Sequence, residues 1–184
     1  MRIVLVLALV ALQSACSISL PFQNRVSYEA VVDAKAAKKD GPGLSLKWLP
    51  ASFPERVDIQ GASGFVGGAS RTRIPTGPAI SQRVTELLDA SMGLKASGTP
   101  LTIEVVNAHS TFQYSAGMFN ITPAIDRAGC TFEAKFTLGT KTWTNTFKAE
   151  KKDPKIGGTS QTGLLEQVWD DIAVQVYKDV LAHT

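Results

Sequence analysis

Residues 130–149, CTFEAKFTLGTKTWTNTFKA, contain the clearest strand pattern in the chain. Every second residue at the start of this stretch is apolar, which is the period of a strand with one buried face; these residues are Cys130, Phe132, Ala134 and Phe136. The segment 138–141 predicts a turn, and Trp143 and Phe147 then share one face of a returning strand. The stretch therefore predicts an antiparallel hairpin.

Two helices are expected on either side of this hairpin in the sequence. Residues 164–182 carry an apolar stripe at helical spacing, formed by Leu165, Val168, Trp169, Ile172, Val176, Tyr177 and Val180. Residues 79–92 carry a second stripe, and Gly93 is placed to end that helix. We expect the polar residues of both helices to face solvent, including Arg83 and the adjacent pair Asp170 and Asp171.

The earlier part of the chain predicts further strands of the same sheet. Segments 44–49, 56–60 and 101–106 fit strands, and residues 61–77 fit a glycine-rich loop. Residues 26–39 fit both a strand and a helix. This order of elements predicts an α+β domain over residues 25–184, with a mostly antiparallel sheet and two amphipathic helices packed on one face.

The first residues have the character of an export signal. Arg2 precedes an apolar run from Ile3 to Leu12, which is too short for a permanent membrane helix but fits the apolar segment of a signal peptide. Small residues follow, in the order Ser14, Ala15, Cys16. We therefore expect residues 1–15 to be removed.

Ser14-Ala15-Cys16 resembles the lipobox of bacterial lipoproteins, although Leu12 lies one place further from the cysteine than is usual in that family. The resemblance implies that Cys16 is acylated and attaches the chain to a lipid bilayer. It also implies sorting to the outer membrane, since Ser17 and not Asp follows the cysteine. Residues 16–24 would then form the lipidated cysteine and a tether. The alternative is an ordinary signal-peptidase cut, for example after Ser17.

Charge and cysteine content argue against a nucleic-acid-binding protein, a disulfide-rich protein and a zinc protein. The formal net charge is +3 and Arg2 leaves with the leader, so no strong attraction to nucleic acid is expected. The two cysteines, Cys16 and Cys130, provide neither a disulfide framework nor a zinc spacing. We expect Cys130 to be buried in a strand; a disulfide between the two would preclude lipidation of Cys16.

The motifs that suggest chemistry lack the context they need. Residues 61–67, GASGFVG, resemble the nucleotide fingerprint of short-chain dehydrogenases, but Pro75 and Pro78 interrupt the helix that should follow. His109 and His183 have no neighbour at a metal-ligand spacing. We therefore expect no enzyme, no cofactor and no metal; an exported hydrolase is the weakest hypothesis.

Two groups of side chains suggest binding. Phe112, Tyr114 and Phe119 lie in an irregular segment, where they would line a groove for a ligand or partner or else pack in the core. Lysines gather in two places, which suggests solvated loops or contact with anionic headgroups; they are Lys35, Lys38, Lys39, Lys148, Lys151, Lys152 and Lys155.

These features favour a non-enzymatic envelope lipoprotein that is anchored at the outer membrane through acylated Cys16, faces the periplasm and binds or scaffolds an envelope protein. The alternative is a soluble periplasmic or secreted protein that binds a small ligand.

Overall fold

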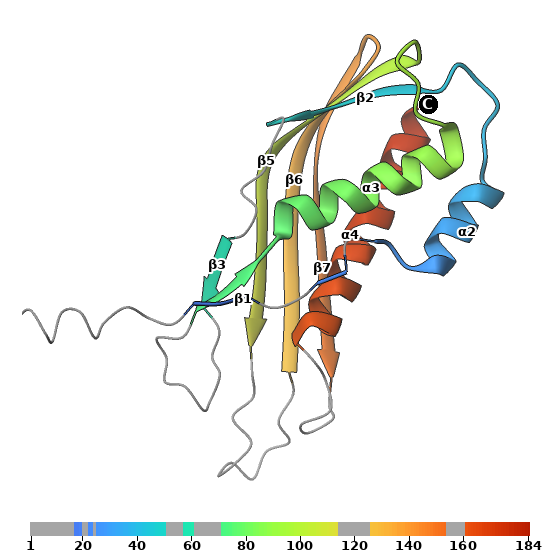
Figure 1. The fold of residues 1–184 in the computed structure, drawn as a ribbon. Helices are drawn as coiled ribbons and strands as arrows, with labels where there is room; N and C mark the ends of the chain where they lie inside the picture. Colours follow the sequence, from blue (N-terminus) through green and yellow to red (C-terminus); the bar gives the residue numbers. More distant parts are fainter. Residues whose placement is uncertain are drawn as a thin grey trace, which may run out of the picture.

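The computed structural model describes seven stretches of the chain, residues 17–19, 22–23, 25–50, 57–60, 71–113, 126–153 and 161–184. The elements in chain order are β1 (Ser17–Ser19), α2 (Tyr28–Ala36), β2 (Leu44–Leu49), β3 (Val57–Gln60), β4 (Arg71–Ile74), α3 (Thr76–Met92), β5 (Thr99–Gln113), β6 (Asp126–Leu138), β7 (Lys141–Asp153) and α4 (Gln161–His183) (Figure 1). The fold is of the α+β class.

The main sheet has four strands in the order β2-β5-β6-β7. β5, β6 and β7 are antiparallel to their neighbours, whereas β2 pairs with β5 in parallel. The sheet is therefore mixed, and the prediction of a mostly antiparallel sheet was wrong. The cause is the long connection between β2 and β5, which contains α3, because a helical crossover returns the chain in the same direction.

A second sheet has three short strands in the order β1-β4-β3. Its strand β3 confirms the strand predicted near residues 56–60 but does not join the main sheet, so the prediction that the early strands share one sheet was wrong. β4 falls inside the segment that we expected to be a loop. β3 contacts β5, so the small sheet lies beside one half of the main sheet (Figure 1).

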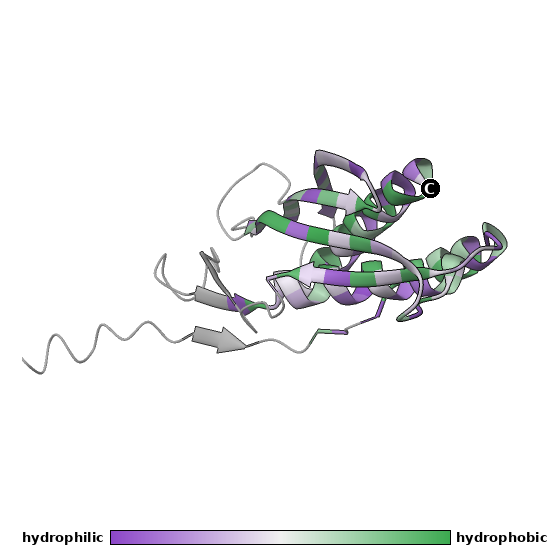
Figure 2. Ribbon diagram, turned by 90° about the horizontal axis from the view of Figure 1, so that it is seen from above, coloured by the Kyte–Doolittle hydropathy of each residue, from purple (hydrophilic) through white to green (hydrophobic). Residues whose placement is uncertain are grey.

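The predicted hairpin is confirmed and is longer than expected. β6 and β7 pair from Leu138↔Lys141 to Asp126↔Asp153. Gly139 has a φ of +58°, a conformation that glycine adopts at low cost in a tight turn. Burial alternates along β6 as the sequence predicts, and hydrophobic and hydrophilic residues alternate along the strands in Figure 2. β7 continues past Ala149 to Asp153, although the residues there are charged.

β5 also extends beyond its prediction, which ended at Val106. The register shifts between Val105 and Asn107, and Val106 is 61% exposed at this bulge. Before the bulge, Leu101 and Ile103 point into the core. After the bulge, the inward side chains are those of Ala108, Ser110 and Phe112. A single inserted residue reverses the face that each later side chain occupies.

The helices enclose the core against the main sheet. α4 contacts β6 and β7, α3 contacts β2 and β5, and the two helices contact each other (Figure 1). α2 resolves the ambiguity of residues 26–39 in favour of a helix, and it packs on α3. The largest side chains of the core have less than 2% exposure and include Trp169, Phe132, Phe136, Ile80, Leu87, Leu165 and Ile172.

Candidate functional site: the N-terminal clamp

The start of the domain is bound by a buried arginine on α3. The Arg83 side chain is 1% exposed, and its Nε lies 2.7 Å from Oδ1 of Asp170 on α4. Its Nη1 donates to the carbonyl oxygen of Ala79 at 3.1 Å, and its Nη2 donates to the carbonyl oxygen of Gln23 at 3.0 Å. Arg83 thus joins α3, α4 and the N-terminal segment in one network.

Three carboxylates on the same two helices accept backbone N–H groups from this segment. The pairs are Gln23 N to Glu166 Oε1 at 2.6 Å, Val26 N to Glu86 Oε2 at 3.3 Å, and Ser27 N to Asp170 Oδ2 at 3.0 Å. Hydrogen bonds to charged acceptors are stronger than those between neutral groups. The segment is therefore bound through its backbone, so most side-chain substitutions in it would leave the hydrogen bonds intact.

An aromatic contact completes the attachment. The ring of Phe22 lies 4.9 Å from that of Trp169, and the guanidinium of Arg83 lies 5.6 Å from the Trp169 ring. Both contacts fall within the range of attractive aromatic and cation–π geometry. We call the five side chains that hold the segment the N-terminal clamp; they are Arg83, Glu86, Glu166, Trp169 and Asp170.

The clamp corrects two expectations about exposed residues. Arg83 belongs to the buried stripe of α3, and the Asp170 side chain is only 21% exposed because it pairs with Arg83. A charge this deeply buried requires a partner, and Asp170 provides it. Asp171, one residue further along, pairs instead with Lys151 at 2.8 Å on a half-exposed surface.

The described part of the segment before the clamp is also paired. β1 runs parallel to β4, with Ser17 opposite Arg71 and Ser19 opposite Arg73. Ser17 directly follows Cys16 in the sequence. Within the described residues, pairing with the domain is therefore present one residue after the predicted site of lipidation, in the segment that we expected to be a tether.

Behind the clamp, a buried hydroxyl joins both helices to the sheet. Ser110 Oγ on β5 accepts hydrogen bonds from Thr76 Oγ1 at 2.9 Å and from Trp169 Nε1 at 3.0 Å. Ser110 also forms a side-chain hydrogen bond with Cys130 on β6. Burial raises the pKa of the Cys130 thiol to about 11, and the hydrogen bond opposes part of this rise. Cys130 is buried in a strand, as predicted, and its thiol is free.

Of the aromatic residues predicted to meet a ligand, the structure describes Phe112. Phe112 is 2% exposed and packs in the core, because the bulge in β5 turns it inward. Cys16, Tyr114, Phe119 and the glycine-rich stretch 61–67 lie outside the described residues. Their predicted roles remain predictions.

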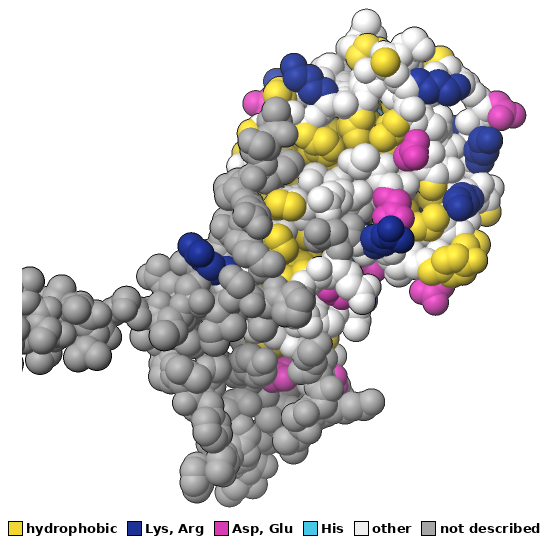
Figure 3. Space-filling view, viewed as in Figure 1, with side chains coloured by type: hydrophobic (Ala, Val, Ile, Leu, Met, Phe, Trp, Pro, Cys, Tyr) yellow, Lys and Arg dark blue, Asp and Glu magenta, His cyan; other side chains and the backbone are white. Residues whose placement is uncertain are grey.

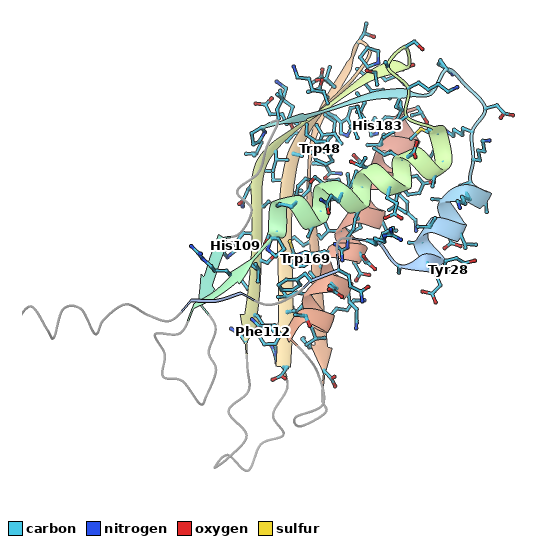
Figure 4. The ribbon with its side chains drawn as sticks, in the orientation of Figure 1. Tyr28, Trp48, His109, Phe112, Trp169 and His183 are labelled. Carbon is cyan, nitrogen blue, oxygen red and sulfur yellow. The ribbon has the colours of Figure 1, made fainter. Side chains whose placement is uncertain are left out.

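The two histidines lie far apart (Figure 4). His109 is exposed on β5, whereas the His183 ring stacks on Trp143 with centroids 4.0 Å apart. Within the described residues, no group of three His, Cys, Asp or Glu side chains is arranged to hold a metal ion. The described helices include none that is both long and apolar enough to cross a membrane.

The lysines of the first group lie together with two acidic residues: Lys35, Lys38 and Lys39 line one hollow with Lys95, Asp40 and Asp89. Lys39 Nζ donates to the carbonyl oxygen of Leu181 at 3.2 Å, near the end of α4, where a cation is favoured. Lys152 pairs with Glu150 at 3.2 Å, and Lys155 lies outside the described residues. On the helix-bearing side in Figure 3, the coloured basic side chains are interspersed with acidic ones. The described surface on that side has no extended basic patch.

Comparisons with known proteins give limited likeness. No family model matches the chain, and no curated protein matches it. A solved structure of a minor lipoprotein from Acinetobacter baumannii is 17% identical, covers 77% of this chain and 92% of its own, and has a TM-score of 0.48. A structure of an uncharacterized protein is 13% identical, covers 90% of this chain and 99% of its own, and has a TM-score of 0.43. Likeness at this level assigns neither a family nor a function.

Proposed function

We propose that this chain is a non-enzymatic cell-envelope lipoprotein. Acylated Cys16 anchors it at the outer membrane, facing the periplasm, and its domain binds or scaffolds an envelope protein. The observation that supports the anchor most directly is the apolar run from Ile3 to Leu12 followed by Ser14-Ala15-Cys16. The pairing of Ser17 with Arg71, one residue after the cysteine, bears on how the domain would sit on that anchor. It leaves almost no free chain between an acyl group on Cys16 and the folded domain.

Burial of acyl chains provides enough free energy to hold the protein on a bilayer. Each buried methylene of an acyl chain contributes about 0.8 kcal/mol, so two or more chains hold a protein stably on a bilayer. Because β1 and the N-terminal clamp fix the chain directly after the anchor, the domain would keep a defined orientation. The end with β1, β3 and β4 would face the bilayer, and the opposite end, where α4 finishes, would be available to a partner (Figure 1).

Labelling with radioactive palmitate in a bacterial host tests the anchor. We expect the wild-type protein to take up label and to sediment with membranes, and Cys16→Ser to lose both properties. Cys130→Ala is the matched control, because it removes the other cysteine and should retain both. An unlabelled wild type, or Cys16→Ser that sediments with membranes as wild type does, would contradict the proposal. A cleaved, unlabelled protein free in the periplasm would support the soluble binding protein instead.

A further inference from the structure

The face of the main sheet opposite the helices carries a hollow that the proposed anchor does not use. It lies over β5, β6 and β7 and has a volume of about 500 Å³. Its centre is Gly129, and the side chains around it include His109, Thr111, Arg127, Thr131, Lys148 and Glu150. Small-molecule sites commonly have volumes of about 300–1,000 Å³.

The strand register explains why these side chains converge. Thr111 and Glu150 lie opposite Gly129 on the two neighbouring strands. In the next row across the sheet on one side, His109 and Lys148 lie opposite Thr131. In the next row on the other side, Gln113 and Lys152 lie opposite Arg127. Side chains in adjacent rows of one face are close enough to contact the same ligand. The bulge at Val106 is required for this, because it turns His109 and Thr111 outward.

The glycine at the centre is unusual for its position. Gly129 lies inside a long strand that is paired on both sides, where glycine weakens a sheet and often marks the close approach of a ligand. A Cβ at this position would lie 2.9 Å from Thr111 Oγ1. A larger residue would therefore partly fill the hollow and displace the threonine hydroxyl.

The charges around the hollow favour an anion. Glu150 is paired with Lys152 at 3.2 Å. Among the described residues, the Arg127 and Lys148 side chains have no ion-pair partner. These two cations, two threonine hydroxyls and an exposed imidazole surround the hollow, and Arg and Lys are the usual partners of phosphate oxygens.

We propose that the hollow around Gly129 binds a phosphate group carried by a larger molecule. The group would lie between Arg127 and Lys148 and accept hydrogen bonds from the hydroxyls of Thr111 and Thr131. The volume leaves room for the glycerol or sugar to which the phosphate is esterified. The site is on the half of β5 that contacts the small sheet, and therefore on the end proposed to face the bilayer (Figure 4). Phosphorylated lipid headgroups and soluble phosphate esters share this chemistry.

Titration calorimetry of the mature protein in a neutral detergent tests the proposal. The probes are dihexanoyl phosphatidylglycerol, glycerol 3-phosphate and inorganic phosphate. We expect Arg127→Gln and Lys148→Gln each to weaken binding about tenfold, and Gly129→Ala to weaken it without loss of the cooperative unfolding transition. The matched control is Lys135→Gln, which also removes an exposed charge from the same face of β6, but outside the hollow, and should leave binding unchanged.

The probes separate the two sources of phosphate. Binding of the lipid alone would support a headgroup ligand, and equal binding of glycerol 3-phosphate would support a soluble ester. The proposal would be overturned by a wild type that binds no probe. It would be overturned equally by Lys135→Gln weakening binding as much as Arg127→Gln, since binding would then follow net charge and not the hollow. Neither result depends on acylation of Cys16.

Discussion

Asp170 accepts the Nε–H of Arg83 at 2.7 Å with one carboxylate oxygen and the backbone N–H of Ser27 at 3.0 Å with the other. The Asp170 carboxylate on α4 thus neutralises the buried Arg83 guanidinium of α3. The same carboxylate binds the backbone of the N-terminal segment at Ser27. The N-terminal segment is consequently part of the folded unit.

The first prediction concerns this carboxylate. Asp170→Asn leaves the Arg83 guanidinium buried without its counter-charge, and breaking a buried ion pair costs about 3–5 kcal/mol. We expect a value near the lower end, because the Asp170 side chain is one-fifth exposed. Urea denaturation followed by circular dichroism measures the change in the free energy of unfolding.

Asp171→Asn is the control for that experiment. It makes the same chemical change one residue away, where the partner is the half-exposed Lys151. Exposed ion pairs contribute less than about 1 kcal/mol, so the control should remain close to wild type. Equal losses in the two variants would show that the clamp has no special role.

The second prediction concerns the aromatic contact of the clamp. Phe22→Ala removes the ring that packs 4.9 Å from Trp169, and we expect unfolding to become easier by about 1–3 kcal/mol. Hydrogen exchange should also rise at the amides of Gln23 and Val26. Tyr28→Ala is the matched aromatic truncation; Tyr28 is 81% exposed, so its loss should change the stability by less than about 0.5 kcal/mol. A Phe22→Ala protein as stable as Tyr28→Ala would argue that the segment is not held.

The third prediction concerns the buried hydroxyl that joins helices and sheet. Ser110→Ala removes the acceptor of both the Thr76 hydroxyl and the Trp169 indole N–H. A buried donor without an acceptor costs about 1–3 kcal/mol, and we expect a destabilisation in or above this range. Thermal unfolding followed by Trp fluorescence measures it. An unchanged midpoint would mean that water or another side chain replaces the acceptor.

The fourth prediction is a pH dependence that arises from Cys130. Burial raises the folded pKa of this thiol to about 11, against 9.0 for an ordinary thiol, so the unfolded chain ionises first as the pH rises. The contribution of the neutral thiol is therefore complete below pH 9 and is lost between about pH 9 and 11, with a maximum of about 2–3 kcal/mol. Comparing the free energy of unfolding of wild type and Cys130→Ala across this range isolates it. Parallel curves for the two proteins would exclude the effect.

Sequence patterns predicted the elements whose signals are local. The hairpin follows from strict alternation in residues 130–137, and the helices α3 and α4 follow from their apolar stripes. Gly93 ends α3 where it was predicted to, whereas both helices begin three residues before their predicted starts. The parallel placement of β2 was missed because pairing between distant strands leaves no local trace. β5 was cut short at Val106 because a bulge reverses the alternation on which the prediction rests.

The N-terminal clamp and the hollow around Gly129 were not predicted from the sequence. Arg83 was assigned to a solvated face because a charged residue at the margin of an apolar stripe is usually exposed. Its burial depends on Asp170, which lies on another helix far along the chain. The hollow around Gly129 likewise combines three strands, and the sequence signal that remains is a glycine inside a strand.

Mass spectrometry of the N-terminal peptide, from protein extracted from the membranes of a bacterial host, is the sharpest check on lipidation of Cys16. We expect a mature chain that begins at Cys16 and carries acyl chains on that residue. A mature chain that begins at another residue, or that begins at Cys16 without acyl chains, would contradict it.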